Sequence, residues 1–274
     1  MENNKNKKLI ITLTAITGIC VLSFAYYNLV YKGLGFDKMK NKNKKEIIVE
    51  SNKLKWIIMN KIIVPISSKN FYEEKDKQNI KNKIDSISNK YGKIIDEVSK
   101  LEFLPSNIIK SFIYIESGGD ENVSNGNTVG LMQISTTTVT EVLYYEYKYK
   151  RMSKEEEDYL IKYIGNDKYN DIKSKAKLRM KSSYLTTDLI KKPELNILFG
   201  SMYLSQLFDR FTENGIVQIH KIVAAYNTGL FSKTLAKLKS VDIKDIDSKI
   251  DEINKITASY ILKLAGANGL LTFV

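Results

Sequence analysis

The sequence predicts a mainly α-helical domain that follows an N-terminal transmembrane helix. Three observations support this fold class. From about residue 82 onward, apolar residues recur at spacings of three and four, which is typical of amphipathic helices. The sequence shows neither the sustained alternation of apolar and polar residues that is typical of strands nor a βαβ order. Residues 9–31 form one long uncharged segment. With 274 residues, the chain has room for one good-sized domain and an appendage.

The uncharged segment from Leu9 to Tyr31 is long enough to cross a membrane. At roughly 1.5 Å per residue in a helix, its 23 residues span a hydrocarbon core. Three lysines precede it, as in a signal anchor. We therefore expect residues 1–8 to be a short cytoplasmic tail and residues 9–31 an uncleaved anchor, although Ser23–Ala25 also suits a signal peptidase. Cys20 is the only cysteine, so no intramolecular disulfide can form.

Positive charge is concentrated near this segment. Residues 1–80 carry fifteen lysines and seven acids, so they account for +8 of the net charge of +12. This distribution favours binding to anionic lipid or wall polymer and argues against a nucleic-acid surface on the main domain. We expect residues 32–81 to be a basic tether and membrane-proximal segment. Within it, residues 47–66 around Trp56 are expected either to pack on the domain as a short helix and strand or to contact the membrane surface.

Two helices are expected next along the chain. The first begins near Asn82 and ends before Pro105, which is well placed to begin the second. The second covers Ser106–Ser117 and is stopped by Gly118–Gly119. The apolar face of the first helix is formed by residues three and four apart, namely Ile84, Ile87, Tyr91, Ile94, Val98 and Leu101.

Three helices are expected in the C-terminal part. Pro193–Phe211 has a proline at its start and one apolar face, and Asn214–Gly215 form the turn that follows it. Ile216–Tyr226 is a second apolar helix. The apolar pattern over Ile250–Leu264 predicts the last helix.

Glu116 is placed for acid catalysis. It lies at the C-terminal end of an apolar helix, where burial raises the pKa of a carboxylic acid and the helix dipole disfavours a negative charge. A carboxylic acid with a raised pKa can protonate a leaving oxygen, as cleavage of a glycosidic bond requires. The alternative is a glutamate that is simply exposed in a turn.

Three motifs in this order resemble those of the lytic transglycosylase (goose-lysozyme-like) family. They are Ile115–Gly119, Gly130–Ile134 and Ala225–Gly229. The resemblance covers residues 82–274 and implies a lysozyme-like domain that cleaves the glycan strands of bacterial peptidoglycan. It implies cleavage of the MurNAc-β-1,4-GlcNAc bond with 1,6-anhydroMurNAc ends, one glutamate as general acid and base, and no metal or cofactor.

The resemblance assigns roles to particular residues. Glu116 is the catalytic acid, and the Tyr226 hydroxyl is expected to hold its carboxyl. Gln133 is expected to hydrogen-bond the sugar beside the cleaved bond, with Gly130 allowing close approach of the backbone. The implied substrate-binding set comprises Ser117, Ser124, Gly130, Gln133, Tyr226, Asn227 and Tyr260.

The resemblance also implies roles for three further residues, and the sequence departs from the family pattern at two positions. Ser117 helps to shape the loop after the acid, and Asn227 orients a neighbouring loop. Ser124 matches a serine near the sugar 6-hydroxyl, although its loop is one residue shorter than usual. Ser135 stands where relatives often have methionine, and Ile256 stands where an acidic residue often precedes the late tyrosine.

An insert at about residues 144–190 distinguishes this chain from the family pattern. It contains eight of the seventeen tyrosines and the charged run Lys154–Asp158, which is expected to begin a solvated helix. Tyrosine rings can stack on sugar faces or pack together. We favour a helical lid or a surface for a protein partner in an envelope complex, with the tyrosines in a small core of its own.

Two rival functions remain open. A muramidase would use water and Asp120 as the base, because hydrolytic glycosidases normally pair two carboxylates. A non-catalytic glycan-binding subunit of an envelope-spanning complex is the other, although such a subunit has no need of Glu116, Gln133 and Tyr226 together.

The expected location rests on the resemblance. Peptidoglycan lies outside the cell membrane, so the domain is expected on the outer side of a single-pass anchor. Lysines after the anchor outnumber those before it, however, and taken alone they favour a cytoplasmic C-terminus. We give the motifs more weight than this charge balance.

Overall fold

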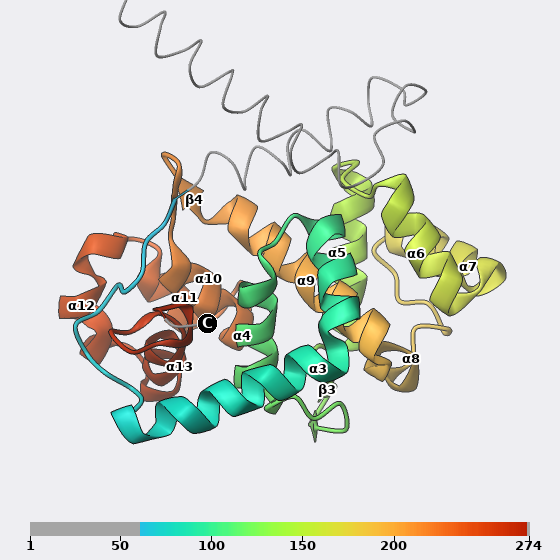
Figure 1. The fold of residues 1–274 in the computed structure, drawn as a ribbon. Coiled ribbons are helices and arrows are strands. Elements are labelled where there is room, and N and C mark those ends of the chain that lie inside the picture. Colours follow the sequence, from blue (N-terminus) through green and yellow to red (C-terminus); the bar gives the residue numbers. More distant parts are fainter. Residues whose placement is uncertain (1–60, 273–274) are drawn as a thin grey trace, which may run out of the picture. The chain divides into compact units, whose positions relative to one another are not determined.

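The computed structural model describes residues 61–272, which are mainly helical. The long helix α3 (Lys77–Glu102) forms from the predicted apolar pattern and begins before Asn82. After a turn in which Phe103 has φ +54°, α4 (Ser106–Ser117) packs against α3 (Figure 1). Both predicted helices are confirmed, and α4 ends as expected at Gly118.

A short hairpin follows α4. It pairs β2 (Ser124–Asn125) with β3 (Thr128–Val129), and Gly126 with φ +60° supplies the positive φ that the tight turn needs. The chain then enters α5 (Thr136–Lys148), because Ser135 caps this helix by accepting the N–H of Thr138 at 3.0 Å. Neither the hairpin nor α5 is predicted by the sequence patterns.

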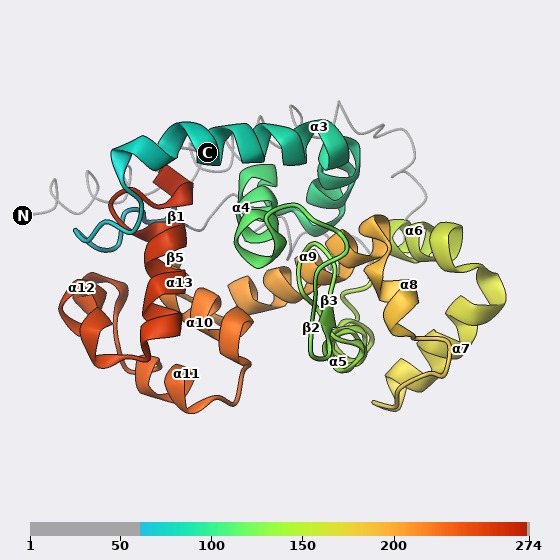
Figure 2. The same cartoon turned by 90° about the horizontal axis from the view of Figure 1, so that it is seen from below.

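The insert is helical. After α5 it comprises α6 (Lys154–Ile164), α7 (Asn166–Lys177) and α8 (Thr187–Lys191). The charged run does begin a helix, and Ser153 and Glu156 form a capping box there. Figures 1 and 2 show α6, α7 and α8 at one end of α9, opposite to α10–α13.

Some of the insert tyrosines form a small core, as predicted. Tyr159 and Tyr169 are buried, and the Tyr169 hydroxyl lies 3.0 Å from that of Tyr147. Others do not follow this prediction, because Tyr149 and Tyr184 are exposed.

Helix α9 (Pro193–Arg210) is buried along most of its length and contacts α3, α5, α8 and α10. It begins at Pro193 as predicted. The predicted helix over 216–226 is wrong in its first part, since Ile216–Val217 form strand β5, paired with β4 (Thr212–Glu213). The turn between them has Asn214 and Gly215 at φ +51° and +76°, which suits a tight hairpin. Helix α10 then covers Ile219–Thr228.

The C-terminal helix is shorter than predicted. After α11 (Lys233–Leu238), residues 243–252 form short turns of helix that include α12 (Ile246–Lys249). Ile253 is extended, and the Asn254 side chain caps α13 (Lys255–Ala265) by accepting the N–H of Ile256 at 2.9 Å. This break interrupts the helix predicted over Ile250–Leu264.

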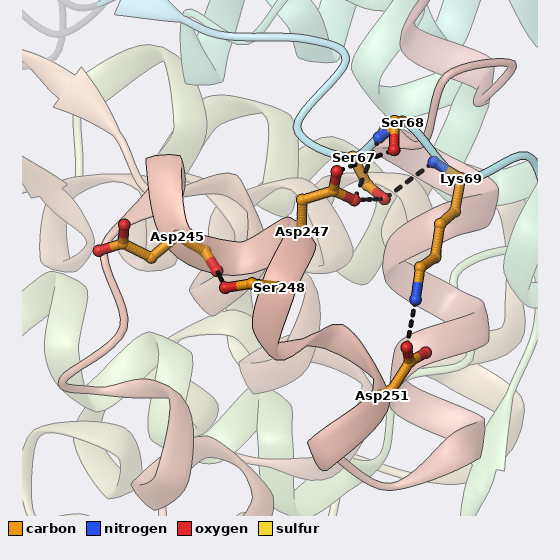
Figure 3. A network of polar contacts seen from close by, with 7 residues as sticks. All are labelled: Ser67, Ser68, Lys69, Asp245, Asp247, Ser248 and Asp251. Atoms are coloured by element: carbon orange, nitrogen blue, oxygen red, sulfur yellow. Dashed lines mark hydrogen bonds and ion pairs between the residues drawn. The ribbon is translucent and has the colours of Figure 1, made fainter.

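An N-terminal strap, residues 61–73, packs on the C-terminal helices. Its strand β1 (Lys61–Ile62) pairs in parallel with β5, and the N–H of Ile66 bonds the carbonyl of Ala265 at 2.9 Å. Figure 3 shows the polar contacts of the strap residues Ser67, Ser68 and Lys69. There, Ser67 and Ser68 hydrogen-bond Asp247, and Lys69 pairs with Asp251. The folded unit therefore includes residues before 82 that were expected to belong to a tether.

The predicted anchor at 9–31 and Trp56 lie outside the described residues. Within residues 61–272, no helix combines the length and the apolar character needed to cross a membrane.

Candidate functional site

Glu116 lies in the last turn of α4, at the edge of the hydrophobic core. The helix ends there because Gly118 adopts φ +63° and its N–H bonds the carbonyl of Tyr114 at 3.0 Å. The Glu116 side chain is half-buried, and burial raises its pKa to about 7. The carboxyl can therefore hold a proton near neutral pH while it remains reachable from a pocket.

Tyr260 of α13 holds this carboxyl. Its hydroxyl donates a hydrogen bond to Glu116 Oε1, which lowers the pKa of Glu116, although the effect of burial is larger. Burial and the negative charge of Glu116 raise the pKa of Tyr260 well above its ordinary value. The phenol therefore stays protonated and can donate at neutral pH.

The prediction that Tyr226 holds the carboxyl is wrong in this structure. The Tyr226 hydroxyl instead donates to the carbonyl of Met132 at 2.8 Å. Its ring is fixed in this direction by edge contacts with Phe112 and a tilted contact with Tyr203, at centroid distances of 4.9 and 5.3 Å. Tyr226 thus supports the Gly130–Ile134 loop. Burial and, to a smaller extent, the negative charge of Glu116 raise the pKa of Tyr226 well above its ordinary value.

The Gly130–Ile134 loop is held by a buried amide. Asn196 of α9 accepts the N–H of Met132 at 2.7 Å and donates to the carbonyls of Val129 and Ile190 at 2.9 and 2.8 Å. Gly130 has φ +80°, and a Cβ there would lie 2.4 Å from Asn196 Nδ2. The glycine therefore admits the Asn196 side chain, whereas the sequence suggested that it admits a sugar.

Gln133 lines the pocket, but its amide is largely used within the loop. Its Nε2 donates to the carbonyls of Gly130 and Val123 at 2.8 and 3.1 Å, and its Oε1 accepts from the Thr128 hydroxyl at 3.1 Å. The residue has φ +45°, a conformation that these bonds stabilise. The second lone pair of Oε1 is what Gln133 can offer to a sugar hydroxyl or amide.

The two predicted serines do not face this pocket. The Ser117 hydroxyl lies 2.9 Å from the carbonyl of Leu131 and 3.1 Å from that of Ile113, so it joins α4 to the loop, as expected for a residue that shapes it. Ser124 is exposed in β2 and does not line the pocket, whereas its neighbour Asn125 does.

The pocket beside Glu116 has a volume of about 430 Å³. It brings together predicted residues from α4, the Gly130–Ile134 loop and α10. The residues that line it are Glu116, Asn125, Thr128, Gln133, Ile134, Thr138, Tyr203, Tyr226, Asn227 and Gly229. Sequence reasoning missed the contributions of Asn125, Thr128, Thr138 and Tyr203, which carry no motif of their own.

Glu116 is the only acid among the described residues that line this pocket. Asp120 is exposed on the turn after α4, and its carboxylate accepts the N–H of Asn122 at 2.8 Å. Glu121 accepts a hydrogen bond from the Tyr91 hydroxyl at 2.8 Å and pairs with Lys90. Neither acid therefore faces Glu116 across the pocket.

Comparison with known proteins gives one match. A family model described as the transglycosylase SLT domain matches residues 172–248. The matched segment includes α9, α10 and the pocket residues Tyr203, Tyr226 and Asn227, whereas Glu116 and Gln133 lie before it. No curated protein and no solved structure matches the chain. This match over residues 172–248 supports the resemblance to lytic transglycosylases, and the SLT domain indicates peptidoglycan cleavage of the transglycosylase type.

Proposed function

We propose that this protein is a peptidoglycan lytic transglycosylase in which Glu116 is the single general acid and base. The observation that carries the proposal is the environment of Glu116. It is the only acid lining the described pocket, burial raises its pKa to about 7, and Tyr260 orients it. A group with this pKa can both release and accept a proton near neutral pH.

This arrangement supports the reaction that the resemblance implies. Protonated Glu116 gives its proton to the oxygen that joins C1 of N-acetylmuramic acid to N-acetylglucosamine, and the C1–O bond breaks. The 6-hydroxyl of the muramic acid then attacks C1 and forms the 1,6-anhydro bond. The Glu116 carboxylate takes the proton of this hydroxyl and returns to its starting form, so no water is consumed. Polar groups of Asn125, Gln133 and Asn227 line the pocket and suit hydrogen bonds to the sugars.

Glu116→Gln tests the proposal directly. This substitution keeps the size of the side chain but removes the proton to be transferred. We expect the release of soluble fragments from purified peptidoglycan by the full chain to fall by at least about two orders of magnitude. Retention of activity in a folded Glu116→Gln variant contradicts the proposed mechanism.

The products separate this proposal from a muramidase. A transglycosylase yields 1,6-anhydromuramic acid ends without oxygen from labelled water, as mass analysis of the fragments can show. The exposed position of Asp120 outside the pocket does not favour a role as a base. We therefore expect Asp120→Asn to retain most activity, and labelled reducing ends would instead support hydrolysis.

We also propose that residues 9–31 anchor the protein in the cell membrane, with the domain on the outer side. The uncharged segment and the location of the substrate support this proposal. The full chain should then sediment with membranes in high salt, and protease added from outside should digest the domain. Protection from that protease contradicts the proposed orientation.

A further inference from the structure

A second pocket, here called the arginine–tyrosine pocket, lies next to the pocket of Glu116. It has a volume of about 470 Å³ and is lined by α5, α9, the turn after α7 and the turn after α10. Thr138 and Tyr203 line both pockets. A polymer bound at Glu116 can therefore extend a side branch into the second pocket without leaving the surface.

The arginine–tyrosine pocket is positively charged. Lys148, Arg179 and Arg210 line it together with one acid, Glu141. Glu141 is occupied by Arg179, whose Nε lies 3.0 Å from each carboxylate oxygen. Within the described part of the chain, no acid forms an ion pair with Arg210. The Arg210 guanidinium is exposed, and its N–H groups can donate hydrogen bonds to an anionic ligand in the pocket.

Arginine is rare in this chain but is concentrated in the arginine–tyrosine pocket. The chain contains 43 basic residues, and only three are arginines, of which two line this pocket. The third arginine is Arg151, whose guanidinium carbon lies 5.7 Å from the centre of the ring of Tyr145, a tyrosine that lines the pocket. Arginine differs from lysine in its planar fork, which binds carboxylates with two hydrogen bonds and stacks on aromatic rings.

Two further features indicate a binding surface. Arg179 adopts φ +58°, a left-handed conformation that is unusual for arginine, and it lies 5.4 Å from the centre of the Tyr144 ring. At the rim, Phe231 is 92% exposed beside Leu230. A large exposed aromatic side chain next to unpaired positive charge suits a ligand with both apolar groups and carboxylates.

We propose that the arginine–tyrosine pocket binds the acidic peptide stem of the glycan strand that is cleaved at Glu116. Stem peptides branch from the muramic acid and combine free carboxylates with small aliphatic groups, whereas the sugars themselves have no need of arginine. The inference rests on the proposed function and adds a preference for strands that carry stems. Arg210 supplies the main contact to a stem carboxylate, and Leu230 and Phe231 contact its aliphatic part.

The test compares two substrates. Cleavage by the full chain is measured on glycan strands with stems and on strands stripped of stems by an amidase. We expect the wild type to cleave stem-bearing strands with the higher kcat/KM. Arg210→Gln should reduce the ratio of the two kcat/KM values by roughly tenfold, the scale of one lost charge-assisted hydrogen bond. Lys93→Gln, an exposed charge change on α3 outside both pockets, should leave the ratio unchanged.

Direct binding makes the result independent of catalysis. A fluorescently labelled free stem peptide should bind the wild type, and Arg210→Gln should weaken the binding by roughly tenfold, as measured by anisotropy. Equal cleavage of both substrates by the wild type overturns the inference, as does an unchanged ratio or unchanged peptide affinity in Arg210→Gln. Absence of cleavage on both substrates contradicts the proposed function instead, and the binding measurement then decides the inference alone.

Discussion

Two opposing effects act on the carboxyl of Glu116. Burial in the last turn of α4 raises its pKa to about 7, and the hydrogen bond from Tyr260 acts in the other direction. The first step of the proposed reaction needs the protonated acid. We therefore expect kcat/KM of the wild type to fall as the pH rises through about 7, where Glu116 loses this proton.

Tyr260→Phe should shift this alkaline limb of the pH profile, the fall of kcat/KM with rising pH, to higher pH. The substitution removes a bond that stabilises the carboxylate, so the pKa of Glu116 rises and the acid keeps its proton longer. We also expect kcat to fall roughly tenfold, because the carboxyl loses its orienting partner. Tyr91→Phe removes a hydroxyl bonded to Glu121 outside the pocket and should leave the limb in place. A limb that stays fixed, or moves to lower pH, in Tyr260→Phe contradicts the assigned role of Tyr260.

The sequence reveals Glu116 more readily than its partners. A glutamate at the end of an apolar helix, followed by two glycines and two further motifs, predicts the acid and three further pocket residues, Gln133, Tyr226 and Asn227. Whether Tyr226 or Tyr260 reaches its carboxyl depends on how α10 and α13 pack against α4, and no spacing rule specifies this. Asn196 does have a sequence signal, namely an amide that lies between Leu195 and Ile197 in an apolar stretch of the helix. A polar group there must be buried and hydrogen-bonded.

At the scale of elements, α9 positions the pocket loop through Asn196. Asn196→Leu keeps a similar volume but leaves the N–H of Met132 and the carbonyls of Val129 and Ile190 without this partner. We expect the free energy of unfolding to fall by about 2–4 kcal/mol, because buried polar groups lose their hydrogen bonds. Cleavage should also decrease, since the loop carries Gln133 into the pocket.

Denaturant unfolding and fragment release measure these two effects. Asn122→Ala is the matched control, because its side chain is exposed and only its backbone N–H is bonded, to Asp120. We expect this control to change the free energy of unfolding by less than about 0.5 kcal/mol. If Asn196→Leu is as stable as the control, Asn196 does not hold the loop.

Helices with long apolar faces were predictable, whereas short elements were not. Helices α3, α4 and α9 follow from periodicity, proline and glycine signals. Strand β5 was not predicted, because a run of apolar residues such as Ile216–Val217 has no period that separates a strand from a helix. Its strand pairing is set by the Asn214–Gly215 turn and by β1, which is distant in the sequence.

At the scale of the whole described unit, the N-terminal strap joins residues that are far apart in the sequence. Residues 61–73 contact α12, α13 and the residues that follow α13, and Asp247 accepts hydrogen bonds from Ser67 and Ser68. Periodicity could not reveal this, because the strap has little regular structure and its partners lie about 180 residues later. Any segment before residue 61 is therefore connected directly to the folded unit, without a free linker over residues 61–73.

Asp247→Ala should release the strap locally. The carboxylate of Asp247 accepts hydrogen bonds from the Ser67 hydroxyl and from the N–H and hydroxyl of Ser68, the latter two at 3.1 and 2.9 Å. These bonds lower the pKa of Asp247. Their loss should speed hydrogen exchange of the amides in 66–73 by about tenfold or more, while α3 and α4 keep their protection. Asp245→Ala is the control, because the Asp245 carboxyl points away from the strap and the hydrogen bonds of this residue are made by its backbone, with Asp242 and Ser248 (Figure 3). Equal exchange of residues 66–73 in the two variants would show that strand pairing and apolar packing hold the strap without Asp247.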